Sequence, residues 1–79
     1  MTTFYKTSDL YFAAFLRVAG VPFHDVEREG GRAYFLFDDQ GPALMRDYRR
    51  QYFADEAKVP AHSYSQAIRT MKSLVYADG

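Results

Sequence analysis

The sequence predicts an α+β domain in which a two- or three-stranded antiparallel sheet packs one face against three helices. Three observations support this fold class. A double glycine separates two segments with the polarity of strands, an apolar helical segment precedes them, and two amphipathic helical segments follow. The chain has 79 residues, with no internal repeat and no linker long enough to separate two domains. We therefore expect a single domain, residues 1–79, with one core.

The composition excludes several classes of protein. There is no cysteine, so disulfides, thiolate zinc sites and cysteine nucleophiles are excluded. Ten basic and ten acidic side chains balance, so no overall field draws the chain to nucleic acid or to an anionic membrane. Neither a secretion signal nor an apolar run of membrane-spanning length occurs. We expect a cytoplasmic protein with no membrane partner, in which seven Phe and seven Tyr supply most of the packing.

The first helix is expected over about residues 8–19. Thr7 or Ser8 is the expected N-cap, and Asp9 would then lie in the first turn, where a negative charge suits the helix dipole. Gly20 can adopt the left-handed conformation that ends a helix, and a proline two residues later prevents continuation. These signals place the end of the helix at the Ala-Gly pair.

The apolar side chains of this helix cover an unusually wide arc. They span about 240° of a helical wheel, whereas a surface helix needs only about 100°. Only a narrow wedge is left for Asp9, Ala13 and Arg17. The surplus must be covered by the rest of the chain or by another molecule. We expect a homodimer that uses Phe12 and Leu16 as its self-association face, with a central helix fully wrapped in a monomer as the alternative.

The segment EREGGRAYFLFDD is predicted to be a β-hairpin, over about residues 23–38. Gly30 and Gly31 would form a type I′ turn, which needs positive φ at both of its central positions. A phosphate-binding loop would instead need a helix directly after the glycines, and a strand follows them. The two strands are then residues 23–29 and 32–38, and residues 2–6 are a candidate third strand.

The turn also fixes which residues of the hairpin face each other. Glu29 lies opposite Arg32, and counting outward from that pair places His24 opposite Phe37. One face then forms the core, with Val26, Ala33, Phe35 and Phe37. The other face is polar apart from Tyr34 and Leu36, and carries Asp25, Glu27, Glu29 and Arg32.

Two amphipathic helices are expected after the hairpin, over residues 42–54 and 61–76. Pro42 suits the first position of the earlier helix. Its apolar residues share one face at 3.6-residue periodicity: Leu44, Met45, Tyr48 and Tyr52. Its arginines gather on the opposite side: Arg46, Arg49 and Arg50. The later helix has the apolar stripe Tyr64, Ala67, Ile68, Met71, Leu74 and Val75.

No motif indicates catalysis, metal binding or cofactor binding. His24 and His62 lie on different elements, and neither has further ligands at the spacing that a metal site needs. Asp38 and Asp39 could be read as a pair of metal ligands, but carboxylates between a strand and a helix are typical of turns and caps. We expect that the protein is not an enzyme and has no catalytic, cofactor-binding or metal-binding residues.

Two surfaces of the predicted fold are candidates for nucleic-acid binding. The letters RAYFLF resemble the central strand signature of the RNA-recognition motif, but that signature has a small residue at Phe35 and an aromatic one at Leu36. Asp25 and Glu27, on the same face, would repel phosphates. The arginine face is the better candidate for an anionic partner, either phosphate or an acidic protein surface, with an ordinary solvated face as the alternative. It consists of Arg46, Arg49 and Arg50.

Three segments, in this order and spacing, resemble a family of small uncharacterised domains of bacteria and phages, known only as a domain of unknown function: FYKTSDLYFAAFLRVAG, GGRAYFLFDD and YSQAIRTMKSLVY. The resemblance covers nearly the whole chain. It implies a cytosolic, prophage-associated setting and supplies neither an activity nor a site residue. The expected function is a non-enzymatic protein-interaction module with an accessory or regulatory role. Nucleic-acid binding through the arginine face is the alternative.

Overall fold

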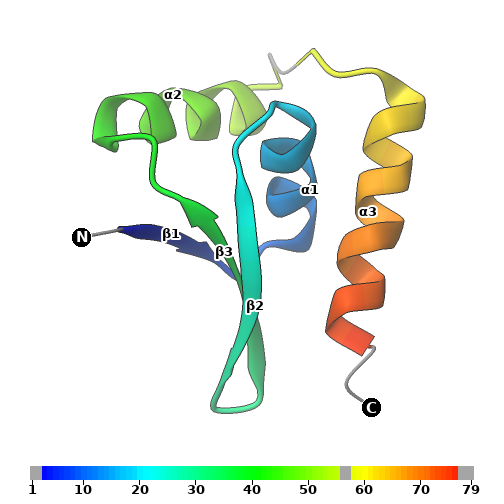
Figure 1. Ribbon diagram of the computed structural model, residues 1–79. Helices are drawn as coiled ribbons and strands as arrows, with labels where there is room; N and C mark the ends of the chain where they lie inside the picture. Colours follow the sequence, from blue (N-terminus) through cyan, green and yellow to red (C-terminus); the bar gives the residue numbers. More distant parts are fainter. Residues whose placement is uncertain (1–2, 56–57, 77–79) are drawn as a thin grey trace.

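Three helices and a three-stranded antiparallel sheet make up the part of the chain that the structure describes. The computed structural model describes residues 3–55 and 58–76. The strands lie side by side in the order β1-β3-β2. The elements, in chain order, are β1 (Phe4–Thr7), α1 (Leu10–Val18), β2 (Phe23–Glu29), β3 (Arg32–Asp38), α2 (Pro42–Phe53) and α3 (Ala61–Tyr76) (Figure 1). The predicted α+β class and the three helices are confirmed.

The N-cap of α1 is Asp9. Its carboxylate accepts hydrogen bonds of 3.0 Å from two backbone N–H groups in the first turn. The prediction of Thr7 or Ser8 as the cap is wrong, because the Thr7 hydroxyl instead accepts the backbone N–H of Asp9, at 3.2 Å. The helix is thereby capped by a charged acceptor, which also suits its dipole. At the other end Gly20 has φ 95°, as the sequence predicts.

The hairpin follows the predicted register except at its open end. Gly30 and Gly31 have φ of 54° and 82°, and the five residue pairs nearest the turn are the predicted ones. Beyond them a bulge shifts the pairing, so that Phe23 lies opposite Phe37 and the prediction of His24 there is wrong. The bulge brings the Phe23 and Phe37 rings together edge to face, with centroids 5.3 Å apart. The residue opposite Phe37 is thus the apolar Phe23 and not the polar His24.

The predicted third strand is confirmed as β1, but it begins and ends later in the chain than predicted. It consists of Phe4–Thr7 and not of residues 2–6; Thr2 lies outside the described residues. It pairs with β3, which is therefore the central strand. Tyr5 lies opposite Phe37, so its ring belongs to the face of the sheet that packs on α1.

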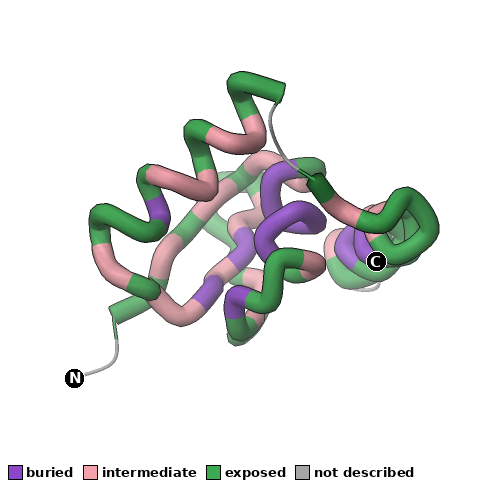
Figure 2. The backbone as a smooth tube through the Cα atoms, turned by 90° about the horizontal axis from the view of Figure 1, so that it is seen from above, coloured by how far each residue is buried: buried purple, intermediate pink, exposed green. Residues whose placement is uncertain are grey.

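The core lies around α1, whose residues 12–16 are all buried by the rest of the chain, whereas Tyr11 and Arg17 stay exposed (Figure 2). Phe12 and Leu16 are only 1% and 0% exposed, so both side chains are internal in one chain and do not form an open face. That the protein forms a homodimer stays a prediction. The alternative, a central helix wrapped within one chain, describes the structure. The buried residues are Phe12, Ala13, Ala14, Phe15, Leu16, Val21, Phe35, Phe37, Met45, Ala67 and Met71.

Helix α3 packs along α1 and has the predicted bounds. Ala13 and Ala14 of α1 and Ala67 of α3 are all buried, and small side chains allow two helices to approach closely. Ala13 was expected in the polar wedge; it is buried because α1 is covered on that side too. The Tyr64 hydroxyl of α3 donates a hydrogen bond of 3.2 Å to the Tyr11 carbonyl of α1.

Helix α2 lies across one end of the sheet and of α1 (Figure 1). It begins at Pro42 as predicted, and Met45 is buried. Tyr48 and Tyr52 contact the rings of α1, with centroids 5.4–6.2 Å from those of Phe12 and Phe15. Leu44 is 43% exposed, so its assignment to the apolar face is wrong.

Among the described residues, no helix combines the length and the apolar character that crossing a bilayer requires.

The hydroxyl of Tyr52 makes the free energy of unfolding depend on pH in the alkaline range. Burial, assisted by the nearby Tyr64 and Asp9, raises the pKa of Tyr52 from 10.0 to about 12. Because this pKa is higher in the folded chain than in the unfolded one, the neutral hydroxyl favours folding below about pH 10, and that contribution is lost between about pH 10 and 12. We expect Tyr52→Phe to lose less unfolding free energy between pH 9 and 11 than the parent does. Urea titrations at the two pH values measure this difference, and equal losses would contradict it.

Candidate functional site

The arginines of the predicted face separate into two environments. Arg46 and Arg49 both line a surface cleft. Arg50 points elsewhere and pairs with the Asp47 carboxylate of its own helix, with Nη2 and Oδ1 2.7 Å apart. All three are exposed, as predicted, but only two of them share a site.

The cleft has a volume of about 320 Å³ and lies where α2 meets β1 and the loop before α2. Its lining residues are Tyr5, Asp39, Pro42, Met45, Arg46 and Arg49. Met45 is 3% exposed and reaches into the core, so the base of the cleft is apolar. A ligand there would meet an apolar surface and two guanidinium groups.

Tyr5 and Phe53 hold the Arg49 guanidinium in place. Arg49 Nη1 donates a hydrogen bond of 3.2 Å to the Tyr5 hydroxyl. The guanidinium carbon also lies 5.6 Å from the centre of the Phe53 ring. The Tyr5 ring is itself fixed against Phe12, edge to face, with centroids 6.3 Å apart. Arg49 is thus oriented by neutral groups, and no carboxylate of the described residues pairs with it.

The cleft carries more positive than negative charge. Within residues 3–55 and 58–76, neither Arg46 nor Arg49 forms an ion pair, and Arg46 makes no hydrogen bond. Asp39 is the one carboxylate among the described residues of the lining, and its Oδ1 accepts the Gly41 N–H at 2.8 Å. This confirms the predicted turn role for Asp39. Two guanidinium groups facing one carboxylate suit a carboxylate or a phosphate, which each can bind through two parallel hydrogen bonds.

A stripe of four residues runs along α2 beside the cleft. Pro42, Arg46, Arg49 and Phe53 follow one another at spacings of four, three and four residues, which places them on one side of the helix. We call them the basic–aromatic stripe. Phe53 is 63% exposed although its ring contacts the core. Sequence reasoning missed it, but the spacing alone could have found it.

The other sequence signal that was missed is Tyr5. It comes from β1, 44 residues before Arg49 in the chain, and reaches the cleft because β1 pairs with β3. No local pattern connects a strand residue at the start of the chain with a helix near its middle. Only the sheet topology, which the hairpin by itself does not define, could have placed Tyr5 there.

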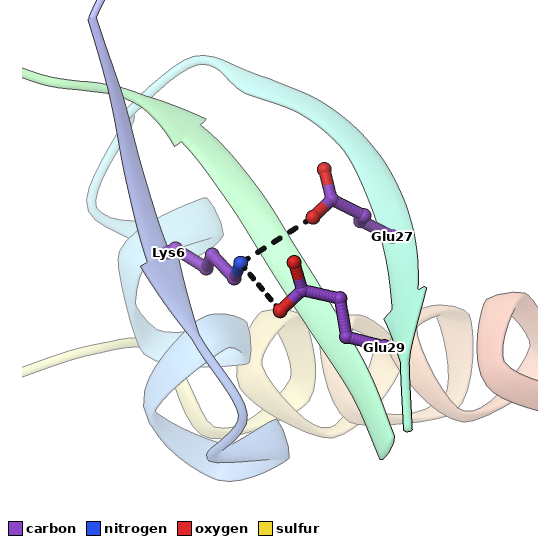
Figure 3. Close-up of polar contacts among 3 residues, drawn as sticks. All are labelled: Lys6, Glu27 and Glu29. Atoms are coloured by element: carbon purple, nitrogen blue, oxygen red, sulfur yellow. Dashed lines mark hydrogen bonds and ion pairs between the residues drawn. The ribbon is translucent and has the colours of Figure 1, made fainter. Parts of the chain in front are cut away.

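On the face of the sheet that points away from α1, Lys6 is paired with two carboxylates. Lys6 Nζ lies 3.3 Å from Glu27 Oε1 and 2.8 Å from Glu29 Oε2 (Figure 3), and 4.7 Å from the centre of the Tyr34 ring. The hydrogen bond between Lys6 and Glu29 raises the pKa of Lys6 and lowers that of Glu29. Because Lys6 already has two carboxylate partners, this face is a weaker candidate for an anionic ligand than the cleft.

The two histidines lie on different elements, His24 on β2 and His62 on α3. His24 stacks on Phe4 of β1, with ring centroids 4.3 Å apart, and His62 is exposed in the first turn of α3. Among the residues that the structure describes, no three His, Cys, Asp or Glu side chains are grouped so that they could hold a metal ion. That the protein is not an enzyme stays a prediction.

Comparison with known proteins agrees with the resemblance found in the sequence. Searches of the curated proteins and of the solved structures returned no match. A family model, Domain of unknown function (DUF5659), matches residues 2–77. The bacterial or phage origin stays a prediction. Because the match spans nearly all of its 79 residues, the chain belongs to the DUF5659 family of domains.

Proposed function

We propose that this domain is a non-enzymatic protein-interaction module that binds an acidic segment of a partner protein in the α2 cleft. One observation supports this proposal above all. Arg46 and Arg49 line the same cleft, and within the described residues neither is paired with a carboxylate. Two such guanidinium groups over an apolar base suit a segment that combines acidic with apolar side chains.

The dimensions and charges of the cleft favour a peptide over nucleic acid. A cleft of about 320 Å³ accommodates one or two side chains, and Met45 and Pro42 offer them an apolar surface. A nucleic-acid backbone is bound by a row of cations that neutralise several phosphates. Here Arg46 and Arg49, which form no ion pair within the described residues, are flanked by Asp39 and by the Arg50–Asp47 pair. Nucleic-acid binding through the arginine face remains the alternative function, and a prophage-associated role stays a prediction.

Replacing both cleft arginines is expected to remove binding without unfolding the domain. In Arg46→Gln/Arg49→Gln, affinity for a fluorescein-labelled ten-residue peptide of Asp, Glu and Leu should fall at least tenfold, because hydrogen bonds between charged groups contribute about 1.5–3 kcal/mol each. The unfolding free energy should change by about 0.5 kcal/mol or less, because both side chains are exposed. Fluorescence polarisation measures the affinity and urea titration the stability.

The matched control removes two positive charges from another surface. Arg69 and Lys72 are exposed on α3, and Arg69→Gln/Lys72→Gln should bind the peptide as the parent does. A cleft variant that binds no more weakly than this control contradicts the proposal. A single-stranded oligonucleotide of equal charge is the second probe. If it binds more tightly than the peptide, with a steep salt dependence, the nucleic-acid alternative is correct.

A further inference from the structure

We infer that the bound segment is extended and carries an aromatic side chain two residues from its acidic residue, and that Phe53 receives this ring. The inference rests on the proposed function of the cleft and specifies the partner sequence that fits it. It comes from the basic–aromatic stripe, in which an exposed aromatic ring follows the two arginines along the same side of α2.

The Phe53 ring is held at its inner side and open at its outer side. Its centroid lies 4.9 Å from that of Tyr52 and 6.0 Å from that of Phe12, which anchor it to the core. It nevertheless remains 63% exposed. A ring that is oriented by its neighbours and open to solvent can accept a second ring at little entropic cost, and such aromatic pairs contribute about 0.5–1.5 kcal/mol beyond their buried area.

Arg49 lies between the two parts of the proposed site, which are the α2 cleft and the exposed side of the Phe53 ring. Its guanidinium lies 5.6 Å from the Phe53 ring centre and also lines the cleft. An acidic side chain bound to Arg46 and Arg49 would therefore lie directly beside the surface on which the aromatic ring packs. The guanidinium can contact the carboxylate through its edge and an aromatic ring through its plane.

The distance between the two halves determines the spacing within the partner. Arg49 and Phe53 are four residues apart, which corresponds to about 6 Å along a helix. In an extended chain, two side chains on the same side are two residues apart and separated by about 6.6 Å. An extended segment running along α2 would thus place an acidic residue on Arg49 and, two residues later or earlier, a ring on Phe53.

The test compares labelled peptides that differ only in the position of the ring. One peptide has the order acid-x-Phe, a second has acid-x-Ala, and a third has Phe directly beside the acid; each is titrated by fluorescence polarisation. With the parent domain, acid-x-Phe should bind five- to tenfold more tightly than either of the others. With Phe53→Leu this preference should fall below twofold, while leucine keeps the apolar contact with Phe12 that helps the fold.

Tyr76→Leu is the matched control, because Tyr76 is also a highly exposed aromatic residue but belongs to α3. It should keep the full preference for acid-x-Phe. Equal affinities of the three peptides, all lost in Arg46→Gln/Arg49→Gln, would overturn the inference and leave the proposed function intact. Affinities that do not depend on the two arginines would overturn both. Tighter binding of a single-stranded oligonucleotide, weakened in Phe53→Leu, would assign the ring to base stacking and also overturn the inference.

Discussion

Phe35→Ala is expected to destabilise the domain by about 3–5 kcal/mol, whereas Tyr34→Ala should cost far less. Phe35 is 1% exposed, lies in the central strand β3 and faces Val26 and Thr7 on the two neighbouring strands. Truncation to alanine removes a ring from the core and leaves a cavity, so it costs both the transfer free energy of the ring and the lost packing. Tyr34 is the adjacent residue on the opposite face, where it is only half-buried.

Urea unfolding followed by far-UV circular dichroism measures both values in one experiment. The two variants remove similar volumes from successive positions of the same strand, so each is the control for the other. Equal losses of unfolding free energy would contradict the register of the hairpin, because a shift by one residue exchanges the buried and the open faces.

Phe12→Lys is expected to abolish folding. The ring of Phe12 is enclosed by those of Tyr5, Phe15, Tyr52 and Phe53, and an ammonium group in that position would lose its hydration without gaining a partner. The chain is small, and the stability of natural domains, about 5–15 kcal/mol, leaves little margin for such a loss. Two losses would show the effect: that of the far-UV circular dichroism signal of the folded state, and that of a cooperative thermal unfolding transition.

Tyr11→Lys is the control for this prediction. Tyr11 precedes Phe12 in the same helix but is 49% exposed, so the lysine can remain hydrated and the variant should fold. Light scattering after size exclusion completes the test. A folded Phe12→Lys variant with a smaller mass than the parent would show that this side of α1 is a contact between two copies and not part of the core.

The elements that sequence reasoning predicted well are those with local signals. The Gly30-Gly31 pair determines the turn and the register next to it, and the amphipathic stripe of α3 gives its bounds, Ala61–Tyr76. Pro42 marks the start of α2. In each case the determining interaction joins residues close together in the sequence, so a local sequence pattern is enough to predict the element.

The wrong predictions concern positions whose environment is determined by contacts between segments far apart in the sequence. The wide apolar arc of α1 is covered by the sheet, α2 and α3 together, which a helical wheel cannot reveal. The wheel therefore assigns Phe12 and Leu16 to a contact between two copies of the chain. The bulge at His24 arises because Phe23 packs on Phe37, an interaction outside the simple hairpin count.

The candidate site was predictable only in part. The spacing of the α2 arginines predicts that they share a face. It does not predict that they have different partners: Arg50 pairs with Asp47, whereas Arg49 donates a hydrogen bond to Tyr5. The cleft exists because β1 pairs with the central strand and brings Tyr5 beside α2. A site built from a strand, a loop and a helix depends on topology, which the sequence pattern of each element does not specify.

Binding of an acidic segment at the α2 cleft is tested most directly by nuclear magnetic resonance. In a titration of the ¹⁵N-labelled domain with the acid-x-Phe peptide, we expect the largest backbone shift changes along α2, from Pro42 to Phe53, and at Tyr5 and Asp39. The arginine side-chain resonances of Arg46 and Arg49 should shift with the same dissociation constant. Changes centred on Lys6, Glu27 and Glu29, or on the outer side of α3, with α2 unaffected, would contradict the assignment of the site.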